Sequence, residues 1–236
     1  MLLTAQQLET CMQATGQRIE YADGHYWLLL DEKRCLLMPW RTNKRLNNMR
    51  QVMTPAFAAG VSAMKSECVV QRCYPLEALA AREIYICEWV LGDKITEVFA
   101  LTDEAQVFHL IGRMAGGTRI TIDITNALHE SVRETERHEV FAKGGSLVDL
   151  PVGMQLATED IYAFRSDSEY PETYSEVILD DTFYTREEAA LIRDIRQALA
   201  NPQELALRKT RYAELMRVVE AAVRSSKTLR REEVQA

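Results

Sequence analysis

Alternation between apolar and polar residues in the middle of this 236-residue chain constrains its fold more than any other feature. Residues 119–124 alternate isoleucine with a polar side chain, which is the period-two pattern of a strand with one buried face. Four more segments have strand character, at residues 94–101, 106–114, 132–142 and 146–150. Gly116-Gly117 and Gly144-Gly145 supply tight turns between them, and consecutive strands joined in this way predict a largely antiparallel sheet.

Helical patterns flank these strands. The apolar residues between Pro75 and Gly92 repeat every three or four positions, which predicts one long helix. Thr4 with Gln7, and Thr185 with Glu188, have the spacing of a capping box and predict two helix starts. Short strands are expected over residues 18–40, with Asp23-Gly24 as a hairpin turn, and a last helix over 212–223 leads into a charged tail.

This order of elements predicts an α+β fold, in which helices pack on one face of an open, largely antiparallel β-sheet. The other face of the sheet must then be solvated or covered by a partner. The segment 132–142 is polar on both of its faces, so burial of apolar surface alone does not explain that strand.

Composition excludes several classes of protein. The net charge of −7 argues against a nucleic-acid-binding surface, and the two basic runs Arg41–Arg50 and Lys227–Arg231 are interpreted as solvated faces. The five cysteines are odd in number and have no CxxC spacing, which favours reduced thiols and a cytoplasmic location. Neither a signal peptide nor a membrane span is predicted, and the scattered histidines predict no metal site.

Several segments together resemble a known family. Residues 88–93 read EWVLGD and are followed by ITEVFA at 95–100. The pattern of sheet strands and a late hairpin follows at 118–126 and 137–149. Near the C-terminus, residues 218–226 read VVEAAVRSS. In this order they resemble the C-terminal domain of the Gfo/Idh/MocA oxidoreductases, the family of glucose-fructose oxidoreductase and inositol dehydrogenase. The resemblance covers roughly residues 65 to 234 and implies that family's open sheet.

The resemblance lacks two parts of the family's machinery. Members normally begin with a Rossmann domain whose G-x-G-x-x-G turn holds the cofactor pyrophosphate, and this sequence contains no such motif. Their signature D-x-G-x-H-x-x-D-x-x-x-W supplies a histidine for proton transfer. Alignment on Trp89 places Arg82 at the histidine and Tyr85 at the second aspartate, and arginine does not exchange protons near neutral pH. No catalytic or cofactor-binding residue is therefore assigned.

Two groups of residues are candidates for a pocket or an interface. Arg82, Tyr85 and Trp89 follow the spacing i, i+3 and i+7, so they share one face of the predicted helix. That face fits either a pocket in which Arg82 holds an anion or sugar acid, or an exposed or interface-facing stripe. Trp40 and Arg41 fit either a pocket mouth or a solvated linker.

These features lead to one main hypothesis and two alternatives. Residues 1–45 are interpreted as a remnant of the end of the cofactor domain, and residues 46–236 as the C-terminal-like α+β domain. The main hypothesis is a non-catalytic binding or assembly subunit, a pseudoenzyme of sugar metabolism. The resemblance implies that it forms a homo-oligomer, or a complex with a full-length relative, through the open sheet. The alternatives are the substrate-binding half of a split sugar oxidoreductase, with NAD(P) supplied by a separate Rossmann chain, and a small-ligand sensor.

Overall fold

The computed structural model describes residues 3–30, 33–53, 60–103, 106–129, 131–132, 134–149, 161–174 and 184–234. These residues form two compact units, which are described separately. Unit 1 comprises residues 1–44 and 177–214, and unit 2 comprises residues 45–176 and 215–236. Helix α6, Pro202–Thr228, contributes its first part to unit 1 and its remainder to unit 2.

Unit 1 is a small antiparallel sheet packed against helices. Its strands β1 (Arg18–Ala22), β2 (His25–Leu30) and β3 (Lys33–Leu37) follow one another in the sheet in chain order. Asp23 and Gly24, which join β1 to β2, both have positive φ, at 54° and 81°, as a two-residue hairpin turn requires. The remaining elements are α1 (Ala5–Thr15), the 3-10 helix η1 (Pro39–Thr42) and α5 (Arg186–Ala200).

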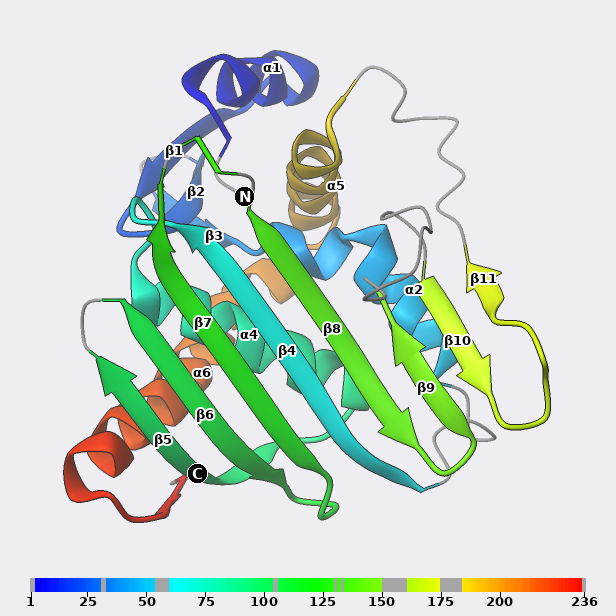
Figure 1. Ribbon diagram of the computed structural model, residues 1–236. Coiled ribbons are helices and arrows are strands. Elements are labelled where there is room, and N and C mark those ends of the chain that lie inside the picture. The colour runs from blue at the N-terminus through cyan, green and yellow to red at the C-terminus, as the bar shows by residue number, and fades with distance from the viewer. Residues whose placement is uncertain are drawn as a thin grey trace. The chain divides into compact units, whose positions relative to one another are not determined.

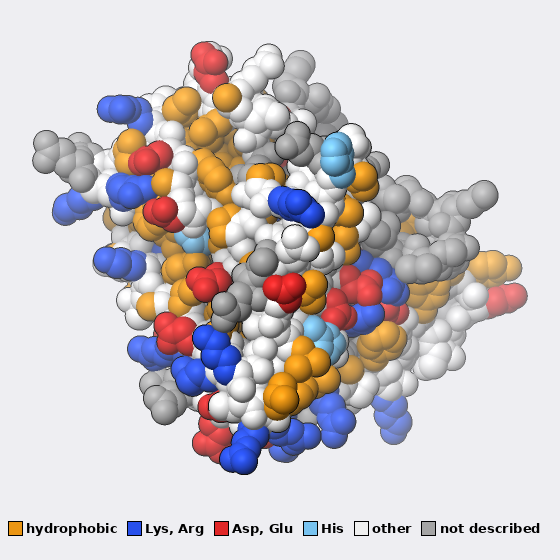
Figure 2. Space-filling model, turned by 60° about the vertical axis from the view of Figure 1, so that its left-hand side comes forward, with side chains coloured by type: hydrophobic (Ala, Val, Ile, Leu, Met, Phe, Trp, Pro, Cys, Tyr) orange, Lys and Arg blue, Asp and Glu red, His pale blue; other side chains and the backbone are white. Residues whose placement is uncertain are grey.

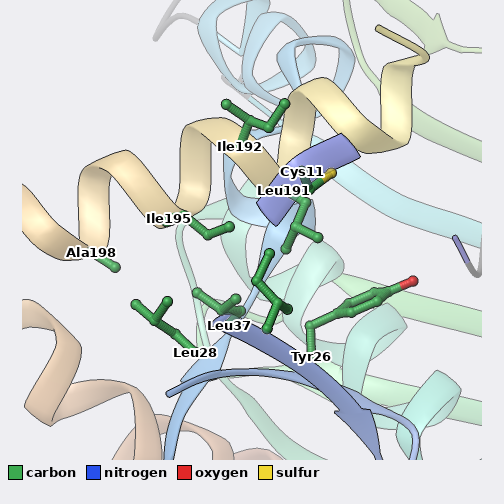
Figure 3. Close-up of a cluster of buried hydrophobic side chains, with 9 residues drawn as sticks. Cys11, Tyr26, Leu28, Leu37, Leu191, Ile192, Ile195 and Ala198 are labelled. Atoms are coloured by element: carbon green, nitrogen blue, oxygen red, sulfur yellow. The ribbon is translucent and has the colours of Figure 1, made fainter. Parts of the chain in front are cut away.

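The core of unit 1 lies between α5 and the small sheet. Leu191 and Ile195 of α5 point toward Leu28 and Leu37 of the strands, and Ile192 of the same helix belongs to the same buried cluster (Figure 3). All five are almost fully buried. The apolar spacing along α5 therefore produces the contact that joins the helix to the sheet.

A buried ion pair also stabilises unit 1. Asp194 of α5 accepts two hydrogen bonds from the guanidinium of Arg208 in α6, at 2.8 and 2.9 Å, and a third from the backbone N–H of Met38 at 2.8 Å. Both charged side chains are almost completely buried. These hydrogen bonds connect α5 to α6 and to the segment after β3, because Asp194 of α5 accepts from Arg208 of α6 and from the N–H of Met38.

Unit 2 is built on a nine-stranded sheet with the order β11-β10-β9-β8-β4-β7-β6-β5-β12 (Figure 1). The strands are β4 (Val61–Gln71), β5 (Ile95–Asp103), β6 (Val107–Met114), β7 (Arg119–Leu128), β8 (Thr135–Ala142), β9 (Gly145–Val148), β10 (Ile161–Arg165), β11 (Glu172–Tyr174) and β12 (Glu232–Glu233). Among these described strands only β4 and β7 pair in parallel. The largely antiparallel, open sheet expected from the sequence is therefore confirmed.

Helices cover one face of this sheet. Helix α4 (Leu76–Leu91) contacts β4, β6 and β7, and Figure 1 shows it behind them. Ser225, in the C-terminal part of α6, accepts a hydrogen bond from the backbone N–H of Ala100 in β5 at 3.1 Å. The inward side chains of β7 include the three isoleucines of the period-two pattern, all buried. We call this covered side the inward face and the opposite side the outward face.

The element boundaries confirm most of the sequence predictions. Both capping boxes form, and the helix expected between Pro75 and Gly92 has Gly92 in the left-handed conformation at its C-terminal end. The hairpin and glycine turns also lie where they were expected. Position 133 of the predicted strand 132–142 and position 150 of the strand 146–150 lie outside the described residues.

Three parts of the chain differ from those predictions. Residues 39–42 form η1 rather than a strand, because Pro39 has no N–H to donate to a sheet. The basic run 41–50 is not wholly solvated, since residues 44–52 form helix α2 and its Arg45 is buried. The charged tail is ordered as well: β12 pairs with β5 at the edge of the large sheet.

Candidate functional site

Arg82, the residue that the alignment on Trp89 pairs with the signature histidine, is surrounded by partners from its own unit. Its Nη1 lies 2.9 Å from a carboxylate oxygen of Glu136 on β8. Its Nε donates to Glu83 at 2.7 Å, and its Nη2 donates to the sulfur of Cys68 at 3.1 Å. Only 13% of the side chain is exposed. The guanidinium is therefore shared between two carboxylates beneath the surface.

His138 lies at the centre of the same polar cluster. Its Nε2 is 2.9 Å from Glu83 on α4, and its Nδ1 is 2.7 Å from Asp149, which follows β9. The Asp149 carboxylate also accepts the backbone N–H of His138 at 2.6 Å and lies 3.5 Å from Nε of Arg45. His138, Glu83 and Asp149 have no exposed side-chain area.

Charges within this cluster balance. Arg45, Arg82 and His138 are the cations, and Glu83, Glu136 and Asp149 are the anions. Burial alone would lower the pKa of His138, but the carboxylates of Asp149 and then Glu83 outweigh it and raise the pKa to about 10.

The carboxylates shift in the opposite direction. Burial opposes their charged forms, yet Arg82 holds the pKa of Glu83 and of Glu136 below the usual range, and Arg45 does the same for Asp149. His138 and the three carboxylates are therefore charged at neutral pH. None of them has a pKa near 7, which general acid–base catalysis needs.

Tyr85 and Trp89, the other two candidates on α4, stack on each other. Their ring centroids are 6.1 Å apart with an angle of 14° between the planes, and the guanidinium of Arg50 lies 3.7 Å from the centroid of Trp89. Tyr85 is buried and Trp89 is half-buried. The helix face predicted from the spacing thus exists, and its three members contact groups of unit 2.

Trp40 and Arg41 belong to unit 1. Both lie in η1, and Arg41 forms an ion pair with Glu204 of α6. Arg82, Tyr85 and Trp89 belong to unit 2, so the structure assigns the two predicted groups to different units. In each group the arginine already has a carboxylate partner in its own unit.

Sequence reasoning missed the centre of the cluster, although two signals pointed to it. One is the unexplained polarity of the segment 132–142, which supplies Glu136 and His138 to the inward face. The other is Glu83, an acidic residue within the apolar stretch of α4. The buried carboxylate of Glu83 on the helix and the imidazole of His138 on the polar strand are hydrogen-bonding partners, so neither buried polar group lacks a partner.

The outward face of the sheet carries a second concentration of charged side chains. His109, Asp123, Glu67 and Arg137 lie opposite one another across β6, β7, β4 and β8. Lys65 and Glu139 form the neighbouring row. Asp123 contacts both His109 and Lys65, and Glu67 contacts both Lys65 and Arg137.

Apolar residues adjoin these rows. Leu101, Val107, Ile111 and Phe141 are exposed by 47%, 43%, 44% and 40% on the outward face. In the view of Figure 2, hydrophobic side chains alternate with groups of charged ones over the surface. The outward face therefore combines apolar and charged character.

Neither a metal site nor a membrane span emerges from the described ranges. Within them no three His, Cys, Asp or Glu side chains are grouped as metal ligands. No helix in the same residues is long and apolar enough to cross a bilayer.

Comparison with known proteins identifies the fold. No family model matches the chain, and no curated protein matches it. An oxidoreductase from Pseudomonas syringae has a TM-score of 0.65 and 12% identity, over 84% of this chain and 63% of that one. An oxidoreductase from Agrobacterium radiobacter, in complex with NAD+, L-tartaric acid and magnesium, has a TM-score of 0.62 and 10% identity, over 83% and 63%.

An aldose-aldose oxidoreductase from Caulobacter crescentus, complexed with glycerol, has a TM-score of 0.61 and 13% identity, over 85% of this chain and 64% of that one. The chain has the fold of these Gfo/Idh/MocA-type oxidoreductases. It spans less than two thirds of the length of each of the three, at 63 to 64%.

Proposed function

We propose that this chain is a non-catalytic, oxidoreductase-like subunit that assembles with a second copy of itself through the outward face of its large sheet. The observation that carries the non-catalytic part is Arg82, which occupies the signature position of the histidine and is paired with Glu83 and Glu136. A hydride-transfer enzyme needs a group that exchanges a proton with the substrate hydroxyl. An arginine held between two carboxylates does not meet that need.

The same pairing argues against an anion-binding pocket at Arg82. A bound carboxylate would have to displace Glu136 or Glu83, and each is held by further contacts within the cluster. Displacement would leave a buried carboxylate without a partner, which is costly. We therefore favour the assembly subunit over the small-ligand sensor.

The proposal includes no nicotinamide site on this chain. The Agrobacterium radiobacter structure contains NAD+, whereas the present sequence has no G-x-G-x-x-G turn for a pyrophosphate. The five cysteines without CxxC spacing support a reducing compartment, and we place the protein in the cytoplasm.

Assembly through the outward face is supported by its composition. Four large hydrophobic side chains there are exposed by 40 to 47%, and both acidic and basic residues lie on the adjoining strands. Exposed apolar side chains bordered by polar residues are typical of protein interfaces. Mixed charges also favour a second copy, because rotation about a two-fold axis can bring acidic groups of one copy opposite basic groups of the other.

Sedimentation equilibrium of the purified chain tests the proposal. We expect a dimer, and we expect Ile111→Lys to weaken it at least tenfold, since the lysine would be buried at the interface. Leu207→Lys is the matched control: Leu207 is also exposed, by 66%, but it lies on α6 in unit 1. A monomer at every concentration would rule the assembly out.

Calorimetric titration with NADH and NADPH tests the absence of a cofactor site. We expect no heat of binding. Micromolar affinity of the chain alone for NADH or NADPH would overturn the non-catalytic assignment and favour an enzyme. Binding that occurs only after a separate Rossmann chain is added would instead favour the substrate half of a split oxidoreductase.

A further inference from the structure

Two adjacent rows of side chains cross the middle of the outward face. The first, which we call the Phe99 row, crosses β5, β6, β7, β4 and β8 through Phe99, Ile111, Thr121, Lys65 and Glu139. The second, which we call the Leu101 row, crosses the same strands through Leu101, His109, Asp123, Glu67 and Arg137. The register therefore makes each residue of one row the neighbour, on its own strand, of a residue in the other.

The two rows have complementary charges on two strands. On β4, Lys65 of the Phe99 row adjoins Glu67 of the Leu101 row, and on β8, Glu139 of the Phe99 row adjoins Arg137 of the Leu101 row. On β5 the two neighbours are both apolar, and on β6 and β7 the member of the Phe99 row is uncharged. No strand thus has like charges at its two positions in these rows.

A two-fold axis that lies in the interface and crosses the strands between the two rows makes use of this pattern. Such an axis lays each strand antiparallel over its own image, so the Phe99 row of one copy faces the Leu101 row of the other. Lys65 then faces Glu67 of the second copy, and Arg137 faces Glu139 of the second copy. Each of these contacts occurs in both directions, because the interface is symmetric.

An axis parallel to the strands gives poorer pairing. Along β7 it would place Asp123 and Arg119 each against its own image, and along β4 it would do the same to Lys65 and Glu67. Between β7 and β4 it would place Asp123 opposite Glu67, because these two lie side by side in the same row. Like charges that face each other across an interface are costly, so the charges favour the axis that crosses the strands.

The other charged side chains on the outward face of these five strands lie outside the two rows. They are Glu97, Arg113 and Arg119 beyond the Phe99 row, and Asp103 beyond the Leu101 row. The axis between the rows places both arginines opposite uncharged residues of their own strands, and it places Glu97 opposite Asp103. Arg231, 3.1 Å from Glu97, offsets part of that like-charge contact.

We propose that the second copy docks about a two-fold axis that crosses the strands between the Phe99 row and the Leu101 row, with Lys65 and Arg137 of each copy paired with Glu67 and Glu139 of the other. This inference rests on the proposed function, because it specifies the contact through which the copies associate. Within one copy Lys65 already contacts Glu67, and Arg137 contacts Glu139. Docking joins the pairs of both copies into networks, which contribute more than isolated exposed pairs do.

Charge reversal on β4 tests the axis, because Lys65 and Glu67 are accessible, with 37% and 33% of their side chains exposed. Lys65→Glu or Glu67→Lys alone makes like charges face each other, so each homodimer should weaken at least about tenfold in sedimentation equilibrium. An equimolar mixture of the two variants should form a heterodimer of about wild-type strength, since each lysine then faces a glutamate. Urea unfolding of each variant separates loss of the dimer from loss of the fold, and Arg137→Glu with Glu139→Arg supplies a second pair on β8.

Arg119→Glu is the matched control. It changes the net charge as Lys65→Glu does, and Arg119 lies on the same face but outside the two rows. Mixed with Glu67→Lys, it leaves the new lysine opposite Lys65 of the second copy. This mixture should therefore associate at least about fivefold more weakly than the mixture of Lys65→Glu with Glu67→Lys.

The outcomes separate this inference from the proposed function. A dimer that neither reversal on β4 weakens overturns the pairing and leaves the assembly proposal intact. Mixtures of equal strength also overturn the axis, since general attraction between oppositely charged variants would then explain their association. A wild-type chain that is a monomer at every concentration overturns the assembly itself, and the axis with it.

Discussion

Raising the pH from about 7 to about 8.5 is expected to remove stability that the buried His138 imidazolium contributes to unit 2. The pKa of His138 is raised from 6.5 to about 10 in the folded protein, chiefly by Asp149 acting against the cost of burial. The folded state therefore binds this proton more tightly than the unfolded chain. The stabilisation is complete below pH 6.5 and is lost progressively as the pH rises toward 10.

The magnitude follows from the width of that interval. One pH unit between the two pKa values changes the free energy of unfolding by about 1.4 kcal/mol, so the step of about 1.5 units costs about 2 kcal/mol. The range ends near pH 8.5 because buried thiols begin to contribute above it. Burial raises the pKa of Cys11, Cys68 and Cys87, and their ionisation in the unfolded chain would add to the loss.

Urea unfolding in the presence of a reductant measures the effect. The difference between the two pH values should shrink in Glu83→Gln, which removes one of the two carboxylates that contact His138. It should persist in His129→Gln, because that histidine is exposed and lies outside the cluster. Equal stability of the wild-type chain at both pH values would refute the assignment of a charged His138.

Three further predictions concern stability and are measured by thermal or urea unfolding. Gly145→Ala should lower the free energy of unfolding by at least about 2 kcal/mol, because Gly145 has φ of 143° and an added Cβ would lie 1.8 Å from the carbonyl oxygen of Phe164. Gly144→Ala is the control: its added Cβ would meet nothing within 4 Å, so the change should be nearly neutral. Arg208→Met should cost about 3–5 kcal/mol by leaving Asp194 buried and unpaired, and adding Asp194→Leu should restore much of the loss. Thr185→Ala should cost about 1 kcal/mol, since the hydroxyl accepts the N–H of Glu188 at the start of α5; no change would mean that the cap is dispensable.

Local sequence patterns were sufficient to predict most of the helices and strands. The alternating isoleucines of β7, the capping boxes at Thr4 and Thr185, and the glycine after α4 each act over a few residues, so a sequence pattern can report them. β4 escaped prediction because its inward positions include Ser66 and Cys68, which weaken the apolar alternation. Helix α2 escaped because its buried Arg45 has the composition of a solvated segment.

The polar cluster was beyond sequence reasoning for a different reason. Its members come from α2, α4, β8 and the end of β9, and they meet only through tertiary packing. A helix face containing Arg82, Tyr85 and Trp89 follows from spacing alone, but the carboxylates that neutralise Arg82 do not. Whether that face serves a pocket or an interface stays a prediction.

The position of β4 has a consequence for how the large sheet is made. Strands β5, β6 and β7 pair with their neighbours in sequence, as do β8 and β9, so two hairpin sets can form from nearby residues. β4 precedes both sets in the chain and joins them, pairing in parallel with β7 and antiparallel with β8. Such non-local pairing forms slowly, because the intervening chain must first be ordered. Docking of β4 is thus the step that turns two sets of hairpins into one sheet, and a shortened chain that begins after Gln71 would lose that connection.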